Sequence, residues 1–141
     1  MSLQDKYRFY SAYHQNYYNR IVHIVTVPII CLSTLLLLPK SVGDLLLLAY
    51  NLYYNYLDSA DGLKWSIFFG MPLWFLRLKL ADQISFQSSL GVNILAWLVQ
   101  VIVGHWIFEK NQPAFLTGLW DSVTVSPLFV MMETEKLLFI I

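Results

Sequence analysis

Two long apolar segments constrain the fold of this chain more than any other feature of its sequence. They are Ile21–Leu38, which reads IVHIVTVPIICLSTLLLL, and Leu90–Phe108, which reads LGVNILAWLVQVIVGHWIF. As a helix, each is long enough to cross a hydrocarbon layer about 30 Å thick. No period-two alternation persists along the chain, and lipid cannot satisfy the unpaired edges of an open sheet. An all-α fold is therefore predicted.

The composition indicates a bilayer as the natural solvent of the chain. Of its 141 residues, 57% are hydrophobic and 13% are charged, whereas a soluble domain carries about 25% charged residues. The formal net charge is zero, which gives no electrostatic reason to expect a nucleic acid as partner. We predict an integral membrane protein that forms a single membrane-embedded domain over residues 1–141.

The remaining apolar segments are shorter or interrupted. Asp44–Asp58 is short for a membrane span, and Leu63–Asp82 contains Gly70 and Pro72. These two segments are expected to form a helical hairpin, with Asp58 or Ser59 capping its second helix. Phe115–Met132 supplies a last apolar stretch. The prediction is a polytopic bundle of four to five helices, whose orientation the balanced loop charges do not decide.

Polar residues within or beside apolar helices are the candidates for function, because an ionisable group at membrane depth costs at least a few kcal/mol. All three histidines of the chain, His14, His23 and His105, lie in or next to the two clearest spans. The other candidates are Asn16, Asn19, Gln100, Glu109, Asp121 and Glu133. For Gln100 and Asp121 we favour a hydrogen bond between helices, or a helix cap at Asp121.

Helical spacing places His105 and Glu109 on one face, with Cβ atoms about 5 to 6 Å apart. They are close enough to share a metal ion or a hydrogen bond. A single histidine or glutamate of this kind is more often an interfacial hydrogen-bonding group or a surface ion pair. That interpretation weakens when all three histidines gather at the same two segments.

Asn16, Asn19 and His23 form a second stripe, along one side of a helix. His14 lies about 180° from His23 around a straight helix. Either a bend separates these two histidines, or they cannot both bind one ion. Imidazole and carboxylate ligands suit iron, zinc, copper or nickel, and two histidines with one carboxylate are usual in non-haem Fe(II) oxygenases. Spacing alone does not choose among these metals.

Three stretches of the chain resemble a known membrane family, the 2-hydroxy fatty acid dioxygenases. They are YHQNYYNRIVHIVTVP, WLVQVIVGHWIFEKNQPA and SPLFVMMETEKL, in the order in which the family has them. The resemblance implies an Fe(II)-dependent enzyme of fatty-acid alpha-oxidation, which uses dioxygen to shorten a 2-hydroxy long-chain acid by one carbon. It also implies residence in the endoplasmic reticulum if the source is eukaryotic.

The resemblance assigns roles to individual residues. The metal ligands and catalytic residues would be His14, His23, His105 and Glu109, with Glu133 as a further candidate. Asn16, Asn19 and Gln100 are expected to fix histidine tautomers by hydrogen bonding. Lys110 is expected to meet the substrate carboxylate.

Two features depart from the family pattern. Some members have a further histidine in the central polar loop, where this chain offers Asp82 and Gln83, and the spacing from Gln100 to His105 is one residue longer. An alternative is therefore a non-catalytic structural subunit of a larger membrane-protein complex. A small transporter using Asp121 and Glu133 is a third reading, although no broken-helix repeat is visible.

Overall fold

The computed structural model describes residues 3–139, which contain helices and no strand. The predicted all-α fold is thus confirmed for this part of the chain. The elements in order are α1 (Leu3–Ser11), α2 (Tyr17–Leu37), α3 (Lys40–Leu57), α4 (Ser59–Trp65), the π-helix η1 (Ser66–Gly70), α5 (Met71–Leu80), α6 (Phe86–Leu98), the π-helix η2 (Val99–Glu109), the 3₁₀ turn η3 (Ala114–Leu116) and α7 (Leu119–Phe139).

The described residues form six continuous helices, because α4, η1 and α5 follow one another without a break, as do α6 and η2. The prediction of four to five helices was wrong, because it did not include the first helix, α1. Its sequence is polar on average, so it gives no membrane-span signal. Its order comes from a stripe of buried side chains, Leu3, Lys6 and Tyr10, at positions i, i+3 and i+7.

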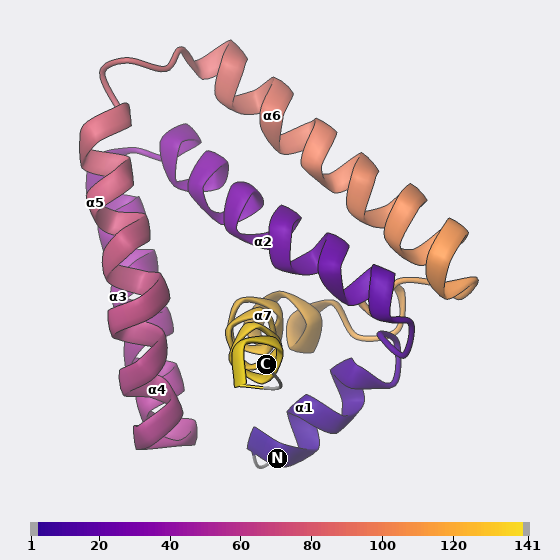
Figure 1. Ribbon diagram of the computed structural model, residues 1–141. Coiled ribbons are helices and arrows are strands. Elements are labelled where there is room, and N and C mark those ends of the chain that lie inside the picture. Colours follow the sequence, from indigo (N-terminus) through magenta and orange to yellow (C-terminus); the bar gives the residue numbers. More distant parts are fainter. Residues whose placement is uncertain (1–2, 140–141) are drawn as a thin grey trace. The chain divides into compact units, whose positions relative to one another are not determined.

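The chain groups into two compact units, Met1–Val27 with Ala96–Ile141 and Pro28–Leu95, so the boundaries fall within α2 and α6. In the first unit α1 packs against α7 (Figure 1). Tyr10 of α1 lies against Phe129 of α7, with ring centroids 4.7 Å apart, and both residues are buried. Both aromatic rings of this contact also lie against the imidazole of His14.

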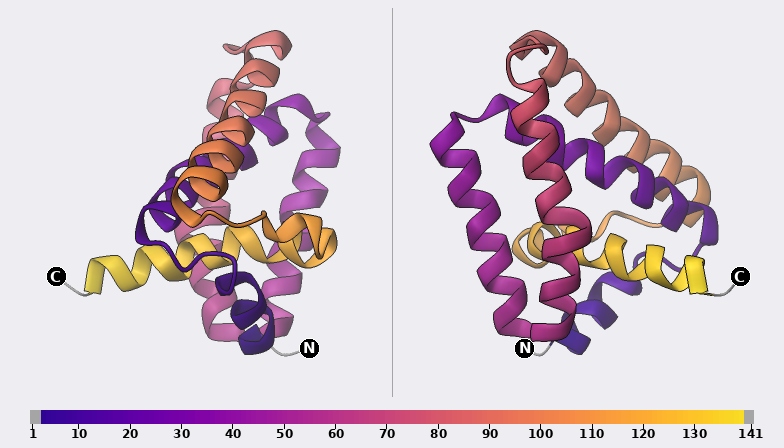
Figure 2. Two further views of the ribbon diagram at one scale, coloured as in Figure 1. Left: turned by 90° about the vertical axis from the view of Figure 1, so that its right-hand side faces the viewer. Right: turned by 60° about the vertical axis from the view of Figure 1, so that its left-hand side comes forward.

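The second unit contains the predicted helical hairpin, which is confirmed. The helix α3 runs beside α4 and η1 (Figure 2). The turn between them is capped as expected, since the Asp58 carboxylate accepts the backbone N–H groups of Ala60 and Asp61. Tyr54 and Trp65 pack edge to face in its core and are almost fully buried.

A buried arginine closes the end of α2 in this second unit. The Arg77 guanidinium, on α5, donates hydrogen bonds of 2.9 to 3.2 Å to four backbone carbonyls. They belong to Leu35, Leu38, Pro39 and Lys40, at and beyond the last turn of α2. The Asp44 carboxylate completes the site at 2.8 Å. Arg77 therefore binds carbonyl groups at the end of α2, where a helix leaves carbonyls without intrahelical partners, and the Pro39 carbonyl also accepts the N–H of Gly43.

Two helices of the described chain are long and apolar enough to cross a membrane, Tyr17–Leu37 and Phe86–Glu109. They coincide with the two spans expected from sequence. The proline within the first of them, Pro28, does not end that helix. Length and composition are what support a membrane location.

Candidate metal centre

His14 lies in the turn between α1 and α2 rather than on α2 itself. This turn is a bend between His14 and His23, the first of the two alternatives that their spacing left open. The imidazole is 2% exposed, stacks on Tyr10 with ring centroids 4.2 Å apart, and donates its Nδ1–H to the Tyr10 carbonyl at 2.7 Å. Burial lowers the pKa of His14 to about 4, so the ring is neutral at physiological pH, the form that coordinates metals.

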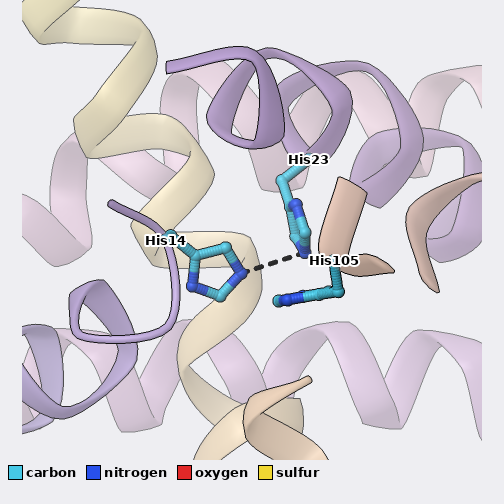
Figure 3. Close-up of side chains that lie close together, drawn as sticks. All are labelled: His14, His23 and His105. Carbon is cyan, nitrogen blue, oxygen red and sulfur yellow. Dashed lines mark hydrogen bonds between the residues drawn. The ribbon is translucent and has the colours of Figure 1, made fainter. Parts of the chain in front are cut away.

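His23 meets His14 from the first turns of α2. Its imidazole is fully buried, and Nδ1–H donates to the Asn19 carbonyl one turn earlier at 2.9 Å. The Nε2 atoms of the two rings face each other at 3.0 Å (Figure 3). The turn before α2 and the first turns of α2 thus bring together two nitrogens from residues that are nine positions apart in the sequence.

The hydrogen bonds of these two rings leave two lone pairs facing each other, an arrangement that a cation between them would stabilise. A carbonyl only accepts, so each Nδ1 carries the proton of its neutral ring and each Nε2 presents a lone pair. Two lone pairs at 3.0 Å repel unless a proton or a metal ion lies between them. Two nitrogens that bind one ion at about 2.1 Å and at right angles lie about 3.0 Å apart. The pair fits a metal ion.

His105 completes the cluster from the π-helix η2. Its ring centroid is 5.0 Å from that of each other histidine, and one ring nitrogen from each of the three residues lies within 4.8 Å of the others. Figure 3 shows the three imidazoles converging from separate segments. The Nδ1 atom of His105 is buried without a hydrogen-bond partner among the described residues. A metal ion would supply such a partner.

The π-helix explains how Gln100 and His105 face the same neighbour. On an α-helix, residues five apart point about 140° away from each other. In a π-helix they are joined by i→i+5 hydrogen bonds and lie on one side. Gln100 accepts a 2.8 Å hydrogen bond from Thr26, and His105 approaches His23, one turn away on the same helix α2. The longer Gln-to-His spacing is accommodated in this way.

Glu109 is not brought into the histidine cluster. Its Oε1 accepts the backbone N–H of Gln15 at 2.8 Å. Its Oε2 accepts the N–H of Asn16 and the side-chain amide of Asn19, each at 2.9 Å. The carboxylate thus accepts three N–H donors, and its oxygens lie outside the group of ligand atoms formed by the three histidines. The ligand role that the resemblance implies for Glu109 stays a prediction.

The three amide side chains expected to fix histidine tautomers do other work. Backbone carbonyls of Tyr10 and Asn19 hold the Nδ1 protons instead. Asn16 caps α2, since its Oδ1 accepts the Tyr18 N–H at 2.8 Å. Gln100 makes the interhelical hydrogen bond that sequence favoured.

Glu133 and Asp121 lie on α7, and each forms ion pairs with basic side chains. Glu133 accepts hydrogen bonds from Tyr7, from Arg20 at 3.1 Å and from Lys136 at 2.9 Å. Burial alone would raise the pKa of Glu133, but these donors together hold it below its usual value. Asp121 pairs with Lys6 of α1 at 2.7 Å. The interhelical contact favoured for Asp121 is confirmed, and neither carboxylate is brought to the histidines.

Lys110 ends the π-helix in a left-handed conformation, with φ of 56°. It lines a shallow, open depression with Trp106, Asn111 and Gln112. Its predicted contact with a substrate carboxylate stays a prediction.

Tyr10 and Phe129 are the site residues that sequence reasoning missed. Phe129 is 1% exposed and packs on both Tyr10 and His14. Both are apolar contacts, so a search for polar residues does not find them. The only sequence signal is that Tyr10 precedes His14 by one helical turn.

Gly104 leaves the space that Asn19 fills beside the histidines. A Cβ atom on Gly104 would lie 2.5 Å from Asn19 Oδ1. Asn19 cannot move cheaply, because it is fully buried and bound to Glu109. We expect Gly104→Ala to lower the free energy of unfolding by about 1 to 3 kcal/mol and to weaken metal binding. Thermal melts and metal titration measure both effects.

Gly91→Ala is the matched control on the same continuous helix. Apart from its chain neighbours and the backbone of its own helix, no heavy atom of the described residues lies within 4 Å of the added Cβ. Alanine favours a helix by about 0.5 to 1 kcal/mol over glycine. This variant should be neutral or slightly stabilised. Equal behaviour of the two variants would contradict the close packing of Gly104 on Asn19.

Comparisons with known proteins match almost the whole length of the chain. The family model for 2-hydroxy-palmitic acid dioxygenase Mpo1-like proteins matches residues 1–138. The chain belongs to the Mpo1-like family. It is 31% identical over 143 aligned positions to the 2-hydroxy-palmitic acid dioxygenase MPO1 of Saccharomyces cerevisiae, an alignment that covers 94% of this chain and 79% of the yeast protein. No solved structure matches this Mpo1-like chain.

Proposed function

We propose that this protein is an Fe(II)-dependent membrane dioxygenase that shortens 2-hydroxy long-chain fatty acids by one carbon. The observation that carries the proposal is the convergence of His14, His23 and His105, with two Nε2 lone pairs facing each other at 3.0 Å. The name of the yeast relative, a 2-hydroxy-palmitic acid dioxygenase, supports the substrate class.

The three histidines would hold the iron, and the chain's other groups prepare them for it. The carbonyls of Tyr10 and Asn19 keep the Nδ1 protons of His14 and His23, so Nε2 is free on both rings. Phe129 and the stacked Tyr10 exclude water from one side of His14. When bound, iron supplies the redox chemistry that dioxygen needs to react with a closed-shell fatty acid.

The overall reaction needs no external reductant. A 2-hydroxy acid and one dioxygen balance as the acid one carbon shorter, carbon dioxide and water. The bond between the carboxyl carbon and the hydroxyl-bearing carbon breaks, and the latter becomes the new carboxyl carbon. Dioxygen takes up the four electrons released. The chain therefore needs to bind only the fatty acid, dioxygen and the metal.

A membrane location suits such a substrate. Helices α2 and α6–η2, which carry His23 and His105, are the two in the described part of the chain that are both long and apolar enough to cross a membrane. Both histidines lie near the ends of these helices, close to the polar residues Asn16 and Lys110. A fatty acid whose tail lies in the bilayer would present its hydroxyl and carboxylate at this level. We therefore propose a polytopic membrane enzyme, of the endoplasmic reticulum in a eukaryote.

Turnover by purified protein tests the proposal. The chain, purified in detergent and supplied with Fe(II), is expected to bind about one iron per chain and to convert 2-hydroxypalmitic acid under oxygen to the acid one carbon shorter. Palmitic acid, which lacks the hydroxyl, and an anaerobic sample are the controls. Absence of bound iron and of shortened product would overturn the assignment and favour the structural subunit.

A further inference from the structure

The three histidines lie on separate segments, so their convergence needs a tie between those segments. His14 is in the turn after α1, His23 is on α2, and His105 is on η2. The Nδ1 hydrogen bonds of His14 and His23 fix these two rings only to their own segments, through carbonyls four residues earlier, and the Nδ1 of His105 has no hydrogen-bond partner among the described residues. They do not hold η2 against the turn or α2.

Glu109 supplies this tie with one carboxylate. It stands on η2, one turn beyond His105. Its Oε1 holds the N–H of Gln15, which directly follows His14, and its Oε2 holds the N–H of Asn16. The same Oε2 accepts the side-chain amide of Asn19, whose backbone carbonyl orients His23. All three histidine-bearing segments therefore meet at Glu109.

The charge of Glu109 suits this position. Hydrogen bonds to a carboxylate are about twice as strong as neutral ones. The carboxylate oxygens of Glu109 also lie at the amino end of the 21-residue helix α2, where the helix dipole favours a negative group. The Asn19 amide is held from its other hydrogen by the Tyr13 carbonyl at 3.3 Å, which adds a second link between α2 and the turn.

We propose that Glu109 is a positioning residue, which holds His14, His23 and His105 in converging geometry and does not bind the metal itself. The oxygens of Glu109 do not belong to the group of ligand atoms that lie within 4.8 Å of one another, so the carboxylate would have to shift away from its N–H donors to become a ligand. The inference rests on the proposed function for the identity of the metal. The tie between segments rests on the hydrogen bonds alone.

Glu109→Gln is the decisive variant, because it keeps the shape of the side chain but turns one acceptor oxygen into an N–H₂ donor that faces backbone N–H groups. Co(II) serves as a spectroscopic probe of the ligand set. We expect Co(II) to bind about 10- to 100-fold more weakly, with absorption bands at unchanged positions. In the metal-free protein, amide hydrogen exchange in peptides covering residues 13–17 should be faster. Glu135→Gln, the same chemical change toward the end of α7, is the control and should behave as wild type.

The outcomes separate the two proposals. Shifted Co(II) bands in Glu109→Gln would make Glu109 a ligand and overturn the positioning role. Wild-type affinity together with wild-type exchange would overturn it as well. If the wild-type protein binds neither Co(II) nor Fe(II), the proposed function fails, and the exchange of residues 13–17 alone then decides whether Glu109 ties the segments.

Discussion

Replacing His105 with alanine is expected to abolish both iron binding and turnover while the helices stay folded. Replacing a residue that hydrogen-bonds to a metal ligand weakens metal affinity about 10- to 100-fold. The loss in His105→Ala should be larger, because only His14 and His23 remain in the cluster. The fold should survive, since the buried Nδ1 of His105 has no hydrogen-bond partner among the described residues whose loss would be felt. The cavity costs about 1 to 3 kcal/mol.

Iron content, oxygen consumption and circular dichroism of the purified variant measure these effects. His105→Leu, which fills more of the cavity without offering a ligand, should lose iron equally and melt closer to wild type. Gln87→Ala, at an exposed position in the first turn of α6, should retain iron and activity. Full turnover by His105→Ala would refute the histidine site. Loss of assembly with other membrane proteins, with no turnover in wild type either, would point to the structural subunit.

The sequence predicts the helices best where the signal is length. The two long apolar runs become α2 and α6–η2 within a few residues, because an uninterrupted run of this length has few alternatives to a helix. The helix α1 was missed because its buried residues, Leu3, Lys6 and Tyr10, include a lysine. A lysine reads as solvent-facing in sequence, but here its ammonium pairs with Asp121 on α7.

The site was predictable in its residue types and not in its geometry. The three histidines could be chosen because apolar helices rarely carry such groups. The α-helical period does not predict the turn that carries His14 or the π-helix that carries His105. The same period placed His105 and Glu109 on one face, close enough to share a metal ion or a hydrogen bond, whereas the chain turns Glu109 toward the N–H groups of Gln15 and Asn16.

Histidine orientation shows a second limit. Sequence suggested side-chain amides as the groups that fix tautomers, since Asn16, Asn19 and Gln100 lie near the histidines. The structure uses the carbonyls of Tyr10 and Asn19 instead. Every residue carries a carbonyl, so its presence gives no signal in a sequence. Only the position of the backbone decides which carbonyl a ring meets.

The largest loss of stability is expected from Arg77→Met. This variant keeps much of the side-chain length but removes the guanidinium donors to the four carbonyls of Leu35, Leu38, Pro39 and Lys40, of which Pro39 keeps the N–H of Gly43. The arginine side chain is 4% exposed, so water cannot replace it freely, and the buried carbonyls pay the cost of lost partners. Removing one partner of such a buried charged network costs about 3 to 5 kcal/mol, equivalent to a fall in melting temperature on the order of 10 °C.

Arg77→Lys and Lys79→Met resolve the cause of that loss. Lysine keeps the charge but cannot reproduce the planar fork that reaches four carbonyls, so Arg77→Lys should melt between wild type and Arg77→Met. Lys79 lies two residues along α5, is exposed, and places its ammonium 5.5 Å from the Phe75 ring centre. Its replacement by methionine removes the same charge and should cost less than about 1 kcal/mol. Thermal melts followed by circular dichroism in detergent compare the three variants. If Arg77→Met melts at the same temperature as Lys79→Met, the end of α2 is held by packing rather than by the guanidinium.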